Sequence, residues 1–131
     1  MNSHIAAVEA LLASLPGDVA YGDATGHTPP YVLLWSSAGN AGLEASVTGE
    51  SGMSDLLGVT WVHTTPRNAL ALAALGRPLL DGVKPTVTGR SVLLTLESSE
   101  PVRVDRDVTL TTTNTHPAYI VDRFRLVSVP A

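Results

Sequence analysis

The most regular pattern of hydrophobic and polar positions lies between residues 56 and 82. In its first part, Leu57, Val59 and Trp61 alternate with their neighbours, which is typical of a β-strand in a mostly buried sheet. A Thr-Thr-Pro sequence follows, and threonine can cap the first turn of a helix in which proline is tolerated. Leucines then recur at helical spacing before a glycine stop, at Leu72, Leu75, Leu79 and Gly82. We expect this strand and helix to form the centre of a small α+β domain.

Shorter patterns on either side predict one more helix and several strands. From Ile5, apolar residues recur at i, i+3, i+7 and i+10, the stripe of a helix that lies on a sheet. Apolar, β-branched runs predict strands at 19–21, 31–35, 91–97 and 118–129. We expect an edge strand or extended arm at 102–110, because its aspartates disfavour a central strand. Residues 37–54 are small and polar, and we interpret them as a flexible hairpin arm.

Two elements carry apolar groups on more than one side. In the last strand, Ile120, Phe124 and Leu126 share one face, and the opposite face is also partly apolar. In the central helix, two leucines lie off the main stripe. One cover is the sheet, and a second cover could be the first helix or another subunit. The candidates for a subunit interface are Leu70, Leu80, Tyr119, Val121, Arg123 and Arg125.

Composition favours self-association over nucleic-acid binding. The 131 residues predict one domain, residues 1–131, and 44% of them are hydrophobic whereas only 15% are charged. The net charge of -4 and the pI near 5.4 argue against a nucleic-acid binder, which needs a basic face. The chain has no cysteine, which excludes disulfides. The first residues lack a basic leader, and no apolar run is long enough to span a bilayer, so we expect neither a secretory signal nor a membrane partner.

The sequence contains no motif that predicts catalysis. The four histidines lack metal-ligand spacing, and the sequence has no H-E-x-x-H, G-x-S-x-G or phosphate-loop pattern. We therefore expect no enzyme activity, no catalytic residue, no metal and no cofactor. The alternative from a different class is a small ligand-binding or enzymatic α+β domain. Its pocket would use Tyr31, Trp61, His63 and Arg125.

The order of these segments resembles the tail terminator proteins of long-tailed bacteriophages, the siphophages, and especially those of actinobacterial hosts. The resemblance rests on PPYVLLW, the 56–82 segment, PTVTGRSVLLTLE, PVRVDRDVT and the closing YIVDRFRLVSV, and it covers nearly the whole chain. It implies an α+β fold with a single-layer antiparallel sheet, mixed pairing being possible, of about four to five strands. It also implies two helices on one face of that sheet.

The same resemblance implies a structural role with no catalytic residues. Tail terminators form a ring, expected here to be a hexamer, that caps the finished tail tube and joins it to the neck proteins of the head. The expected partners are further copies of this chain, the tail tube protein and a head-tail connector. The expected location is the tail or neck of the virion, after synthesis in the host cytoplasm. The alternative within this class is a head-completion adaptor of the neck.

DNA would pass through such a ring without being read. Acidic groups in the arm could line the tube or the lumen and repel phosphate, although loop solvation explains the same acids. The candidates for this tube- or lumen-facing role are Leu43, Glu44, Glu50 and Asp55.

Overall fold

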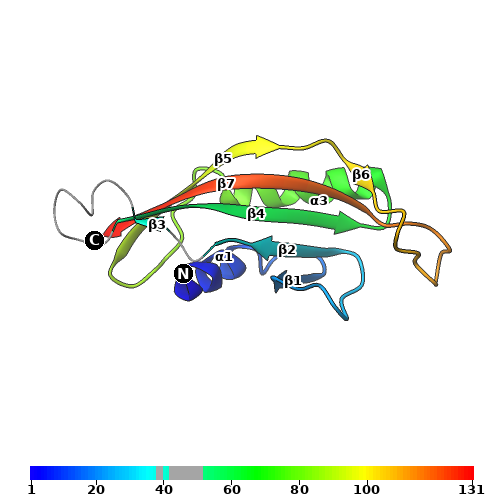
Figure 1. The fold of residues 1–131 in the computed structure, drawn as a ribbon, viewed down its shortest axis with the longest axis horizontal. Coiled ribbons are helices and arrows are strands. Elements are labelled where there is room, and N and C mark those ends of the chain that lie inside the picture. Colours follow the sequence, from blue (N-terminus) through cyan, green and yellow to red (C-terminus); the bar gives the residue numbers. More distant parts are fainter. Residues whose placement is uncertain (38–39, 42–51) are drawn as a thin grey trace.

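Seven strands and two helices make up the described part of the chain, residues 1–37, 40–41 and 52–131 of the computed structural model (Figure 1). The elements in chain order are α1 (Asn2–Leu11), β1 (Asp18–Tyr21), β2 (Tyr31–Trp35), β3 (Asn40–Ala41), β4 (Met53–His63), α3 (Pro66–Leu80), β5 (Arg90–Ser99), β6 (Arg103–Val104) and β7 (Ala118–Pro130). No helix in the described ranges is long and apolar enough to cross a membrane.

One mixed sheet contains all of the strands. Its main path is β1-β2-β4-β7-β5, and the short strands β3 and β6 pair with β4 and β7 respectively. β1 is parallel to β2, and the other pairings are antiparallel. The long strands β4 and β7 lie side by side at the centre, with Trp61 opposite Ile120. The expected α+β class, with a single sheet and two helices on one face, is confirmed, and the sheet has the mixed pairing that the resemblance left possible.

The central strand and helix form as the pattern predicts. Leu57, Val59 and Trp61 of β4 are fully buried against the helices. Thr65 caps α3, because its Oγ1 accepts a hydrogen bond of 3.1 Å from the backbone N–H of Asn68. The helix runs to Leu80, so it ends two residues before the expected glycine stop.

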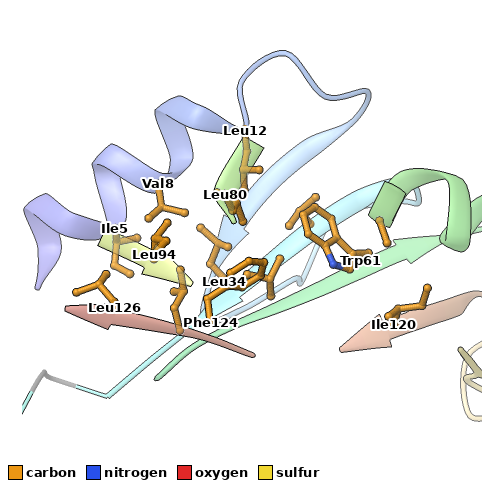
Figure 2. Close-up of a cluster of buried hydrophobic side chains, with 14 of the residues drawn as sticks. Ile5, Val8, Leu12, Leu34, Trp61, Leu80, Leu94, Ile120, Phe124 and Leu126 are labelled. Carbon is orange, nitrogen blue, oxygen red and sulfur yellow. The ribbon is translucent and has the colours of Figure 1, made fainter. Parts of the chain in front are cut away.

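The first helix closes one end of the core. Ile5 and Val8 point from α1 toward Leu126 and Leu94 of the sheet, and Leu12, the residue after the helix, lies near Leu80 (Figure 2). All six side chains are 5% exposed or less. The α1 helix therefore contributes its apolar stripe to the same core that α3 covers.

Two expected segments differ from the structure. β4 begins at Met53, so residues 53–54 belong to the sheet instead of the arm. Residues 38–39 and 42–51 lie outside the described ranges. The edge strand expected at 102–110 is formed only at Arg103–Val104, because the Asp105 carboxylate accepts the backbone N–H of Asp107 and turns the chain there.

A buried histidine couples α1 to the end of the sheet. His4 is 6% exposed, and its Nε2 lies 2.9 Å from Oγ of Ser128. Arg90 donates its Nε–H to the same Oγ at 2.8 Å, so the Ser128 hydroxyl can donate to His4. Within the described ranges, Nδ1 of His4 has no partner. Burial, chiefly, and the positive charges of the N-terminus and Arg90 lower the pKa of His4 below 6.5.

We expect the stability of the protein to decrease in mild acid through this histidine. The unfolded chain binds the proton at higher pH than the folded chain, so the contribution is complete above about pH 6.5 and is lost as pH falls below it. Urea unfolding at pH 7.5 and pH 5 measures the difference. His4→Gln should show a smaller difference between the two pH values than the wild type. Burial also lowers the pKa of His63, so His63→Gln measures the share of the difference that comes from His63. An unchanged difference in His4→Gln would contradict the assignment.

Candidate assembly surface

The face of the sheet opposite the helices carries a large apolar surface, which we call the open sheet face. Strand alternation places its side chains on β2, β4, β5 and β7: Tyr31, Leu33, Trp35, Leu56, Thr60, Val62, Leu93, Thr95, Glu97, Tyr119, Val121, Arg123, Arg125 and Val127. Among them, Leu56, Leu93 and Val127 are 36%, 40% and 37% exposed. Neither helix of the described ranges covers this face (Figure 1).

At the centre of the open sheet face, the indole of Trp35 lies against Gly58. Trp35, Gly58 and Arg123 lie in register across β2, β4 and β7. A side chain at position 58 would overlap the Trp35 ring, so glycine lets the indole lie against the strand. The guanidinium of Arg123 lies 5.6 Å from the ring centroid, and Trp35 Nε1 donates to Thr60 Oγ1 at 3.2 Å. These contacts hold an amphipathic patch, with an indole beside a guanidinium, on the open sheet face.

Glutamates from β5 and the turn after it hold the arginines of β7. Arg125 forms a two-pronged contact with Glu97, at 3.0 and 3.3 Å, and Arg123 donates to Glu100 at 3.0 Å. Asp122, which directly precedes Arg123 in the sequence, projects to the opposite face of β7 and contacts Arg77 instead. Exposed pairs of this kind contribute about 0–1 kcal/mol, so their main effect is to orient the arginines.

A groove of about 310 Å³ lies at one end of the open sheet face. Its floor includes Tyr31, Leu33 and Tyr119, and the 105–117 segment forms one wall with Val108 and Leu110. Asp105 is the carboxylate among the lining residues. Burial, and then the charge of Asp105, raise the pKa of the Tyr31 hydroxyl, which therefore remains a neutral hydrogen-bond donor. The groove is thus an apolar slot with one acidic group.

The interface candidates divide into two surfaces and one core position. Tyr119, Val121, Arg123 and Arg125 lie together on the open sheet face, whereas Leu70 is 52% exposed on α3. Leu80 is fully buried near Leu12, so it has no surface to offer another subunit (Figure 2). The expectation for Leu80 is wrong because the last turn of α3 points it into the core, where α1 covers it.

Three of the four arm candidates, Leu43, Glu44 and Glu50, lie outside the described ranges. Asp55 belongs to β4, is 5% exposed, and accepts a hydrogen bond of 2.8 Å from the Ser37 hydroxyl. Its carboxylate also accepts the backbone N–H of Leu56. Asp55 is therefore a buried strand residue and not part of an arm.

The four residues of the alternative ligand pocket do not come together. Trp61 is fully buried on the helix side of β4, whereas Tyr31 lines the groove on the opposite face. His63 ends β4 and accepts the N–H of Thr64, and Arg125 is held by Glu97. Within the described ranges, no three residues of metal-ligating type are grouped.

Comparisons with protein-family models and with curated proteins found no match. A solved virion chain shares this fold. It comes from a structure described as the virion of a native gene transfer agent particle. The match has a TM-score of 0.55 at 14% sequence identity, and it covers 95% of this chain and 84% of the other. The similarity therefore extends over nearly the whole α+β unit.

Sequence reasoning missed three features of the surface. Trp35 was predicted only as part of the 31–35 strand, although its position opposite Gly58 puts the indole on the open face. Glu97 and Glu100 were not among the candidate residues, although they pair with arginines of β7. The alternation of β7 was the available signal, because it separates Asp122 from the exposed arginines.

Proposed function

We propose that this chain is a structural protein of a phage-like virion and, more specifically, a tail terminator. The observation that carries the proposal is the fold shared with a virion chain over 95% of the present one. The sequence resemblance to tail terminators, which also covers nearly the whole chain, supports the same role.

The open sheet face suits an assembly protein. It combines exposed leucines and valines with arginines held by ion pairs, a mixture that subunit contacts can bury. In the proposed role, copies of the chain form a ring, expected to be a hexamer, which stops growth of the tail tube and contacts the neck. The net charge of -4 would disfavour tight binding of DNA that passes through the ring.

Growth of tail tubes in the presence of the purified protein tests this proposal. We expect tubes of limited length that carry a ring at one end in negative-stain images, and no retention of DNA at moderate salt. The open-face variant Leu93→Lys/Val127→Glu should leave the fold intact and abolish capping, because it introduces charges where apolar contact is required. Binding to filled heads in place of tubes would favour a neck adaptor, and tubes that grow without limit would contradict the terminator role.

A further inference from the structure

The solvent side of α3 is an apolar stripe that nothing in the described ranges covers. We call it the outer α3 face, and it consists of Arg67, Leu70, Ala71, Ala74, Leu75 and Pro78. Leu70 and Leu75 are 52% and 58% exposed. Two leucines this exposed on one helix face, separated by alanines, form a contact surface with little side-chain entropy to lose.

Arg67 gives this stripe a charged end. It lies in the first turn of α3, where the helix dipole disfavours a cation, and that turn contains no acidic residue. Within the described ranges, Arg67 forms no ion pair or side-chain hydrogen bond, in contrast to Arg77, Arg123 and Arg125. A carboxylate from another molecule would compensate this charge.

The groove on the open sheet face offers the complementary chemistry. Its carboxylate, Asp105, accepts only the N–H of Asp107 among the described contacts and has no cationic partner there. Val108, which is 44% exposed, and Leu110 form the apolar wall beside it. The groove therefore presents an unpaired acid next to an apolar wall, as the outer α3 face presents an unpaired base next to leucines.

We infer that the outer α3 face of one copy docks into the groove of the next copy, with Arg67 against Asp105 and Leu70 against Val108. The two surfaces differ, and they lie on opposite sides of the sheet, because α3 covers the face that the groove does not. A contact between two different surfaces is heterologous, and it closes into a ring if the rotation between copies allows. This inference rests on the proposed ring and specifies the contact that builds it.

Charge reversal tests the pairing. Arg67→Glu and Asp105→Arg should each reduce assembly at least tenfold, whereas the double variant should restore it. Arg67→Glu places an acid in the first turn of α3, which the dipole favours, so loss of assembly would not reflect a weaker helix. Lys84→Glu makes the same charge change at another exposed cation and should assemble as the wild type does. Light scattering on the free protein and imaging of tube-bound protein provide the readouts.

The result would overturn the inference if either single reversal assembled normally or if the double variant failed to recover. Because the chain contains no cysteine, Leu70→Cys/Val108→Cys provides a second test by oxidative cross-linking. We expect a ladder of cross-linked oligomers from the double-cysteine variant and none from either single-cysteine variant. Cross-linking through Leu70→Cys alone would indicate a symmetric contact and overturn the inference.

These outcomes separate the two proposals. If the wild-type protein forms rings on tubes but the Leu70→Cys/Val108→Cys variant gives no cross-link, the docking mode is refuted and the terminator role stands. Wild-type protein that neither self-associates nor binds tubes would refute the terminator role itself.

Discussion

Replacing Arg77 with methionine should lower the free energy of unfolding by about 3 kcal/mol, because it leaves a buried carboxylate without its charge partner. Asp122 is fully buried on the helix side of β7. Arg77 of α3 donates to both carboxylate oxygens of Asp122, from Nε at 2.6 Å and from a second guanidinium nitrogen at 2.9 Å. Arg77 itself is 36% exposed, which places the loss at the low end of the range for a broken buried pair.

Asp122 is more deeply buried than Arg77, so we expect Arg77→Met and Asp122→Asn to lower the free energy of unfolding by different amounts. Asp122→Asn leaves Arg77 able to reach water, so we expect a smaller loss of about 1.5 kcal/mol. Arg125→Met is the matched control, because it removes the exposed pair with Glu97 by the same substitution and should change stability by about 0–1 kcal/mol. Urea unfolding of the three variants ranks them. Equal losses for Arg77→Met and Arg125→Met would refute the buried-pair argument.

The same ion pair predicts how acid affects the variant. Burial alone would raise the pKa of Asp122, but hydrogen bonds from Arg77, Ser99 and Trp61 and the Arg77 charge bring it below 3.8. The contribution of Asp122 to stability is therefore present above about pH 3.8 and is lost as pH falls through the lowered pKa. In Arg77→Met, burial dominates, so acid unfolding should begin at higher pH than in the wild type.

Local periodicity in the sequence was sufficient to predict the long elements. The spacing of apolar residues predicts which side is buried in each long element, namely β4, α3, β5 and β7. Threonine and proline mark the start of α3. The ends of the elements depend on pairing between distant segments: β4 gains Met53 and Ser54 by pairing with β3 and β7. The Arg77–Asp122 pair was missed because it joins residues 45 positions apart.

The candidate surface could be predicted only in part. Alternation along β7 brings Tyr119, Val121, Arg123 and Arg125 to one face, as the pattern requires. The groove, however, exists only because the 105–117 segment folds back over the ends of β2 and β4, and no local pattern encodes that path. For the same reason, Leu80 was assigned to a surface although α1 covers it.

Trp61→Ala should lower the free energy of unfolding by about 3–5 kcal/mol. The indole is fully buried between β4 and α3, and its Nε1 donates to Asp122 at 2.8 Å (Figure 2). Truncation removes this packing and leaves the carboxylate with one donor fewer. Urea unfolding measures the loss, and a value near zero would place Trp61 outside the core.

Gly76 faces this indole, and we expect the effect of Gly76→Ala on stability to change sign when the indole is removed. A methyl group at Gly76 would overlap the Trp61 ring, so Gly76→Ala should destabilise the wild type by about 1–3 kcal/mol. In the Trp61→Ala background the overlap is gone, and alanine favours a helix over glycine by about 1 kcal/mol. Gly76→Ala should then stabilise the protein, and a double-mutant cycle measures the coupling. Additive losses would show that the glycine does not accommodate the tryptophan, since packing between the two positions is the only source of the reversal.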